Sequence, residues 1–203
     1  DDAGARSRPI RFAWVALAIA SIVLFSALGI WQLERRAWKL DLIARVTLRV
    51  HAPPVSAPRR ASWPRIDARA DEYRHVLAKG HFLDLRPALV QAVTARGGGY
   101  WVIAPLTTDD GDVVLVNRGF VPSDRAAWPD LAPPRGEAEV TGLLRLSESS
   151  GAFLRHNDPQ ADRWYARDVA AIGQSRGSRD VAPYFIDAEA QPGDPARLPV
   201  GGL

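Results

Sequence analysis

The histidines are the side chains of this sequence best suited to acid–base or metal chemistry: His51, His75, His81 and His156. His75 and His81 are six residues apart, so an unbroken strand would place both on one face. Two histidines make at most half of a metal site, and no third ligand is evident, so we interpret them as surface histidines on a strand. The chain has no cysteine, which excludes disulfides, thiolate nucleophiles and Cys-ligated metals.

The common catalytic motifs are absent. The sequence has no GxSxG, no GxGxxG after a strand, no GxxxxGK[ST] and no HExxH. Gly97–Gly99 lacks the following helix and lysine of a phosphate cradle, and we predict a hairpin turn there. Without a nucleophile–base pair, a hydrolase or transferase is disfavoured. We therefore expect no enzyme, no catalytic residues and no metal site.

Three clusters of mixed polar and aromatic residues are denser than composition requires. They lie at residues 28–39, 116–122 and 157–168. In the cluster at 116–122, polar residues are predicted to end an apolar strand and to form a turn with a structural role. Arg118 can donate hydrogen bonds to a carboxylate or to backbone carbonyls. The candidate interaction or structural residues are Gly29, Trp31, Gln32, Arg35, Arg36, Trp38, Asn117, Arg118, Gly119, Asn157, Pro159, Trp164 and Asp168.

A membrane-spanning helix is predicted over residues 12–31, a run of twenty residues without a charge. At about 1.5 Å per residue, such a helix is about as long as a bilayer's hydrocarbon core is thick. Trp14 and Trp31 lie near its ends, where indoles prefer the headgroup level. A signal-peptide core is typically about 7–15 residues long, so a retained span is favoured over a cleaved leader.

Basic residues are concentrated after this run. Residues 35–69 hold nine basic and two acidic residues, a net charge of +7, whereas residues 70–203 carry −4. This basic collar suits anionic lipid headgroups, and the mildly acidic remainder does not suit nucleic acid. Charge alone leaves the orientation of the span open, because long domains translocate largely regardless of flanking charge.

The predicted fold class is membrane-anchored α+β, with the transmembrane helix followed by a β-rich antiparallel barrel or sandwich with short helices. Apolar residues at helical spacing extend the helix over 32–50, and four prolines favour a linker over 51–72. The domain then covers 73–203. Its predicted strands are Tyr73–Leu83 (with a bulge or bend at Gly80), Ala88–Ala95, Tyr100–Thr107, Val113–Val116, Ala138–Leu146, Trp164–Arg167 and Tyr184–Ala188, with helices opening at Ser123 and Asp168.

Five segments in this order resemble the Surfeit-locus (Surf/Shy-type) family of cytochrome c oxidase assembly factors. They are LGIWQLERRAWK at 28–39, YRHVLAKGHF at 73–82, GYWVIAPL at 99–106, VNRGFVP at 116–122, and NDP with RWYARD within 157–168. The resemblance implies a cytoplasmic tail over 1–11, a domain on the outer side of the membrane, and a second span that would follow the residues of this sequence.

The resemblance also implies a function. It suggests an assembly factor aiding haem a insertion into, or maturation of, subunit I of cytochrome c oxidase; the alternative is a non-catalytic structural subunit or scaffold of a respiratory complex. The implied partners are membrane lipid, subunit I and haem a synthase, without nucleic acid. The implied location is the bacterial inner membrane with a periplasmic domain, or the mitochondrial inner membrane in a eukaryote. Haem a is the implied cofactor, but none of the four histidines matches the family's ligand.

The membrane exit carries one further hypothesis. Trp31 and Trp38 are seven residues apart and share a helical face, with Arg35 and Arg36 between them. This face is predicted to dock on another membrane helix, with Gly29 allowing close backbone approach. The alternative is that Trp31 only anchors the helix at the headgroups.

Overall fold

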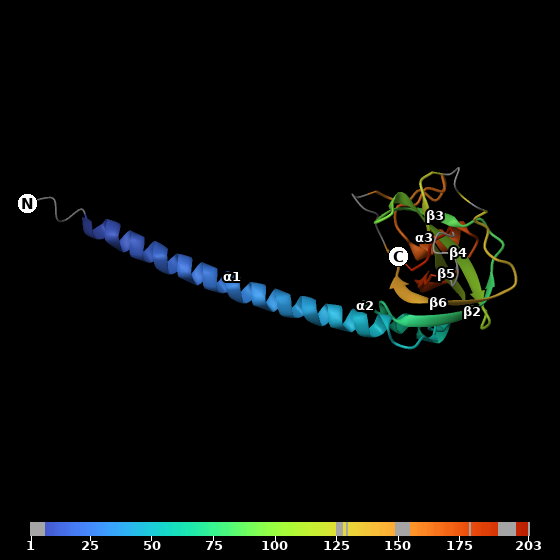
Figure 1. Ribbon diagram of the computed structural model, residues 1–203, viewed down its shortest axis with the longest axis horizontal. Coiled ribbons are helices and arrows are strands. Elements are labelled where there is room, and N and C mark those ends of the chain that lie inside the picture. The colour runs from blue at the N-terminus through green and yellow to red at the C-terminus, as the bar shows by residue number, and fades with distance from the viewer. Residues whose placement is uncertain are drawn as a thin grey trace, which may run out of the picture. The chain divides into compact units, whose positions relative to one another are not determined.

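The structure is a computed structural model that describes residues 7–124, 128, 130–148, 155–178, 180–190 and 198–202. The chain divides into two compact units, residues 1–48 and 49–203. The first unit consists of most of helix α1 (Ser7–Val50), which runs without interruption through the predicted span and the helix after it (Figure 1). Within the described residues, α1 is the one helix long and apolar enough to cross a membrane.

Five strands of the second unit close into a barrel: β2 (His75–Phe82), β4 (Gly97–Thr108), β5 (Val113–Pro122), β6 (Glu137–Leu146) and β7 (Val181–Ala188). Their order around the barrel is β2-β6-β7-β5-β4, and β4 returns to pair with β2. Every neighbouring pair is antiparallel except β5 with β7, which are parallel. Closure satisfies the backbone groups that an open sheet would leave at its edges. The predicted fold class, a membrane-anchored helix followed by a β-rich barrel or sandwich, is confirmed.

Shorter elements flank the barrel. Strand β3 (Ala88–Thr94) pairs with the first half of β4. The segment predicted as a linker contains β1 (Val55–Ser56), which pairs in parallel with β2, the 3-10 helix η1 (Arg60–Arg65) and α2 (Ala68–Asp71). Helix α3 (Val169–Ser175) begins at the predicted cap, Asp168. The helix predicted from Ser123 lies largely outside the described residues.

Two apolar cores result from alternation along the strands, since successive side chains of a strand point to opposite faces. One core fills the barrel around Leu106, Val116 and Tyr184. The other lies between β3 and α3 around Trp164 and Phe185. The Tyr184 hydroxyl donates to the Pro58 carbonyl at 2.8 Å, and burial raises the pKa of Tyr184 well above its ordinary value. This bond ties the segment before η1 to the barrel.

Gly80 in β2 and Gly99 in β4 lie where other backbone or side-chain atoms pack closely, and the bulge and the glycine turn that we predicted do not form there. The β2–β6 register is unbroken from His75 to His81, so Gly80 forms no bulge. A Cβ on Gly80 would lie 2.0 Å from the Thr107 carbonyl oxygen, which shows how closely β4 approaches β2 where the barrel closes. Thr94 pairs with Gly97, so the hairpin turn is Ala95-Arg96 and the glycine cluster belongs to β4.

Candidate functional site

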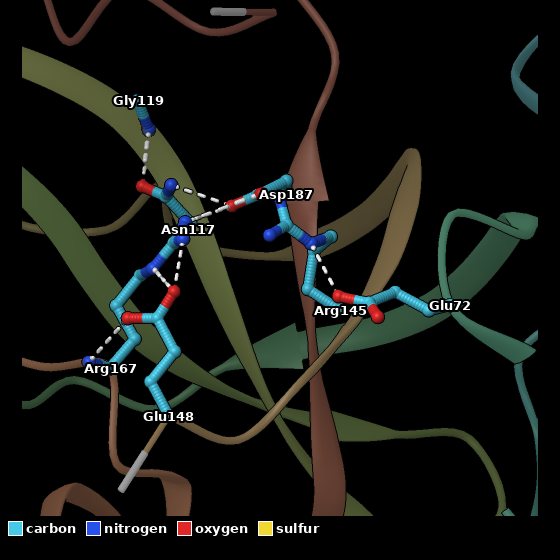
Figure 2. Close-up of polar contacts among 7 residues, drawn as sticks. All are labelled: Glu72, Asn117, Gly119, Arg145, Glu148, Arg167 and Asp187. Carbon is cyan, nitrogen blue, oxygen red and sulfur yellow. Dashed lines mark hydrogen bonds and ion pairs between the residues drawn. The ribbon is translucent and has the colours of Figure 1, made fainter. Parts of the chain in front are cut away.

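A polar network lies at the carboxyl end of β7, centred on the carboxylate of Asp187 (Figure 2). The Asn117 side-chain amide donates to Asp187 Oδ1 at 2.7 Å. The Arg145 Nη1 donates to Oδ2 at 3.2 Å, and Arg167 Nη1 reaches both oxygens at 3.2 and 3.3 Å. The Asp187 side chain is 17% exposed, so one largely buried carboxylate accepts from an amide and two guanidinium groups.

A second carboxylate, that of Glu148, holds Arg167 from the other side. Arg167 Nε and Nη2 donate to Glu148 Oε1 at 3.1 and 2.5 Å, and the Arg167 backbone amide donates to Oε2 at 3.1 Å. Burial raises the pKa of Glu148, but the hydrogen bonds and charge of Arg167 outweigh it and leave that pKa below its ordinary value. The Arg167 guanidinium also lies 4.7 Å from the centroid of the Phe185 ring.

The network closes at Arg145 and Glu72. Arg145 Nε is 3.5 Å from Glu72 Oε1, and the guanidinium lies 4.7 Å from the centroid of the Tyr73 ring. Two cations therefore face three carboxylates. Each carboxylate already faces a guanidinium, so none is placed as a free base or nucleophile. The arrangement fixes the position of the strands and loops that it joins.

Asn117 and Gly119 belong to this network, and the prediction that they end a strand is wrong. Strand β5 continues through them to Pro122, and Asn117 Oδ1 accepts from the Gly119 amide at 3.1 Å. Gly119 has φ +126°, and a Cβ there would lie 2.4 Å from the Val200 carbonyl carbon and oxygen. Phe120 and Val200 exchange two backbone hydrogen bonds of 2.9 Å. Gly119 therefore allows the C-terminal segment, residues 198–202, to lie against β5.

Arg118 is directed away from the network. Its Nη1 donates to the backbone carbonyls of Leu131 at 2.7 Å and Ala132 at 3.2 Å, which confirms one of the two predicted partner types. The guanidinium lies 5.9 Å from the centroid of the Phe82 ring, and burial lowers the pKa of Arg118. Arg118 fixes the segment before β6.

Asn157 organises the loop that carries Arg167. Its Oδ1 accepts from the amides of Tyr165 at 2.8 Å and Ala166 at 3.0 Å, and its Nδ2 donates to the Ala166 carbonyl at 3.1 Å. The predicted strand over residues 164–167 is wrong for this reason: a side chain satisfies these backbone groups, and the segment makes only one bridge, between Val90 and Trp164.

The other candidates in this loop have structural roles. Trp164 is 2% exposed and donates from Nε1 to Asp162 Oδ1 at 2.7 Å. Arg176 Nη2 reaches the same oxygen, also at 2.7 Å. The exposed Pro159 accepts from the Asp162 amide at 3.4 Å. The Asp168 carboxylate caps α3 by accepting from the Ala171 amide at 3.1 Å.

The remaining candidates lie on α1, within the first unit, and all of them are exposed. The Arg35 guanidinium lies 5.2 Å from the centroid of the Trp31 ring. Among the described residues, no atom outside the helix's own nearby backbone lies within 4 Å of a Cβ placed on Gly29. The remaining members of this set are Gln32, Arg36 and Trp38.

Most residues of the network were not predicted from the sequence: Glu72, Arg145, Glu148, Arg167 and Asp187. A usable signal was present, because Arg145 interrupts the apolar run Leu143–Leu146 and Asp187 follows Tyr184–Ile186. A charge within an apolar strand needs a partner if it is buried.

The described residues do not fit a haem or metal site. Both ring nitrogens of His75 face oxygens, the Ala52 carbonyl at 2.6 Å and Glu189 Oε1 at 2.9 Å. His51, His81 and His156 are exposed. Among the residues that the structure describes, no three histidine or carboxylate side chains gather as metal ligands.

The Glu148–Arg167 pair predicts an acid-sensitive domain. Because the pKa of Glu148 is lowered in the folded state, its contribution to stability is present above the ordinary glutamate pKa and is lost as the pH falls through the lowered value. Urea unfolding of the wild type between pH 3 and pH 7 should show this loss. In Glu148→Gln the unfolding free energy should be lower at pH 7 and depend less on pH; a pH dependence equal to that of the wild type would contradict the assignment.

Comparison with known proteins identifies the family of this chain. A family model described as the SURF1 family matches residues 19–201. Surfeit locus protein 1 of Xenopus tropicalis is 34% identical, over 93% of this chain and 64% of that protein. The Homo sapiens protein of the same name is 36% identical, over 93% of this chain and 66% of its own length. A SURF1-like protein of Monosiga brevicollis is 33% identical, over 93% of this chain and 74% of that protein. The chain thus spans slightly less than two thirds of the Xenopus and human relatives.

Proposed function

Because this chain belongs to the SURF1 family, we propose that it is a membrane-anchored assembly factor for cytochrome c oxidase. The observation that carries the proposal is the family match over residues 19–201, which includes most of the candidate span and nearly all of the barrel unit. The finer proposal is that the protein acts on subunit I of the oxidase at the stage of haem a insertion, with haem a synthase as a second partner.

The proposed role is that of a rigid, non-catalytic partner. The charged groups of the network around Asp187 pair with one another. The described histidines do not form a haem site. The barrel would therefore act by contacting the immature subunit, and no step in this proposal depends on haem bound by the described residues.

The basic collar, residues 35–69, supports attachment to an anionic membrane surface. Some of its arginines instead pair with groups of the protein itself. Arg59 pairs with Asp110 at 2.9 Å, and Arg60 Nε lies 3.6 Å from Asp112 Oδ1. Arg49 donates to two backbone carbonyls of the barrel unit. The exposed cations of α1, Arg35, Arg36 and Lys39, are better placed to meet lipid phosphates. We propose the bacterial inner membrane as the location, with the barrel on the periplasmic side.

The second candidate is a permanent structural subunit or scaffold of a respiratory complex, which the absence of a catalytic arrangement among the described residues supports equally. Affinity purification of the tagged protein separates the two. An assembly factor should co-purify with subunit I that lacks haem a and be absent from the mature, active oxidase. Stoichiometric recovery with the mature enzyme would instead establish a structural subunit.

The exposed face of α1 supplies a mutational prediction. Gly29→Leu adds a bulky side chain where a Cβ meets open space, so the protein should still insert at its normal level. If this face docks on another membrane helix, oxidase activity should fall several-fold, since small residues allow close helix approach. Ala27→Leu, about 200° around the helix, is the matched control and should keep normal activity. Full oxidase activity with Gly29→Leu would exclude docking of this face. The remaining interpretation would then be that Trp31 anchors the helix at the lipid headgroups.

A further inference from the structure

An exposed apolar stripe runs along α1 beyond the predicted span. Helix α1 continues there without interruption to residue 50 (Figure 1). Successive residues of the stripe are four, three, four and four positions apart, so all of them lie within about 80° around the helix. They are Leu33, Ala37, Leu40, Ala44 and Leu48. The three leucines are 67%, 56% and 73% exposed, and an apolar stripe of this kind usually packs against a partner.

Where α1 ends, the barrel unit contacts other side chains than those of the stripe. Arg49 Nη1 donates to the Glu72 carbonyl at 3.0 Å, and Arg49 Nη2 donates to the Arg69 carbonyl. Arg49 and Val50 are partly buried, whereas Leu48 is exposed. Because Arg49 lies about 100° around the helix from Leu48, these contacts use a different side of α1 from the stripe.

The spacing of the stripe fits a pair of identical, parallel helices. The steps of four, three and four from Leu33 to Ala44 are those of a heptad repeat, with leucine at position d and alanine at position a. Leucine at d is typical of parallel two-stranded coiled coils, and small residues such as alanine let two helices approach closely. Copies of this chain that cross one membrane in the same direction bring their α1 helices together in parallel. The membrane anchor therefore supplies the orientation that the repeat requires.

The charged residues beside the stripe are complementary between two parallel copies. In this heptad register Arg36 takes position g and Asp41, five residues later, takes position e. Position g of one helix lies next to position e of the following heptad on its partner, so Arg36 of each copy would face Asp41 of the other. Two-fold symmetry makes this ion pair twice. Residues five apart on one helix lie about 140° apart around it, so a single chain cannot make this contact.

We propose that two copies of this chain pair at the membrane surface through the stripe on α1, as a short parallel coiled coil. Burial of the leucines against their symmetry mates removes apolar surface from water. About two heptads form a weak interface between chains that are free in solution, but a shared membrane holds the helices at a high effective concentration. The pairing concerns the association of the chain with itself and does not depend on the proposed role in oxidase assembly.

Cysteine crosslinking tests the pair, because the sequence has no cysteine of its own. Leu40→Cys places a thiol at position d, where the two copies meet, and mild oxidation of membranes that hold the full chain should give a disulfide-linked dimer. Leu42→Cys is the matched control, because Leu42 is also an exposed leucine of α1 but lies about 200° around the helix from Leu40. It should give several-fold less dimer. Equal yields from the two variants, no dimer from Leu40→Cys, or an adduct with a different protein in its place would overturn the proposal.

A charge swap tests the register of the pair. In the Leu40→Cys protein, Arg36→Glu places a carboxylate opposite Asp41 of the other copy and should lower the dimer yield several-fold at an unchanged level of the protein in the membrane. Adding Asp41→Arg restores opposite charges and should restore the yield. A yield that Arg36→Glu leaves unchanged, or that Asp41→Arg fails to restore, would refute the parallel pairing.

Discussion

Asp187→Asn is expected to lower the unfolding free energy of the barrel unit by about 2–4 kcal/mol, because two largely buried guanidinium groups lose their shared carboxylate. The side chains of Arg145 and Arg167 are 24% and 13% exposed, so water replaces the lost partner only in part. Urea denaturation of the wild type and the variant at neutral pH measures the difference.

The control for Asp187→Asn is a surface ion pair of the same barrel. Lys79 and Glu139 pair at 2.7 Å between β2 and β6, with side chains 52% and 57% exposed. Glu139→Gln should change stability far less, because exposed pairs contribute little. Equal destabilisation by the two variants would mean that the Asp187 network has no special role in the fold.

Gly119→Ala is expected to detach the C-terminal segment from β5. The new Cβ would lie 2.4 Å from the Val200 carbonyl group, and φ of +126° is strained for any residue with a side chain. The two backbone hydrogen bonds between Phe120 and Val200 should be lost, with a destabilisation of about 2–4 kcal/mol. Hydrogen exchange at the Phe120 and Val200 amides and urea denaturation provide the two readouts.

Gly111→Ala is the control that separates the two effects expected of Gly119→Ala, the steric clash with Val200 and the backbone strain of a positive φ. Gly111 also has a positive φ, of +83°, but a Cβ there meets nothing within 4 Å. This control should destabilise the domain by its backbone strain alone and leave the Phe120 and Val200 amides protected. If Gly119→Ala also leaves those amides protected, the C-terminal segment does not depend on Gly119.

A β-rich barrel or sandwich could be predicted from the sequence because alternation and turn residues are local signals. The strand expected over Ala138–Leu146 differs from β6 by one residue, and α3 begins at its expected cap, Asp168. The end of β5 could not be predicted in this way. Gly119 looked like a turn former, but the glycine is needed for contact with Val200, far along the chain, which no local pattern reveals.

Most of the network could not be predicted from the sequence, for a related reason. Asn117 was singled out because polar residues stood at the expected end of an apolar strand. Its role depends on a distant partner, because Asn117 meets Asp187 seventy residues later, and Arg145 meets the same carboxylate from forty-two residues away. These contacts form because β6, β7 and β5 are neighbours in the barrel. The order of strands around a barrel cannot be derived from the spacing of residues along the sequence.

The proposed role in oxidase assembly is tested most directly by the haem a content of subunit I in cells that lack this protein. Oxidase purified from such cells is expected to contain less haem a per subunit I. Expression of the wild-type protein should restore the haem a content, and Asp187→Asn should restore less. Normal haem a content and normal oxidase activity in the deletion strain would refute the proposed role.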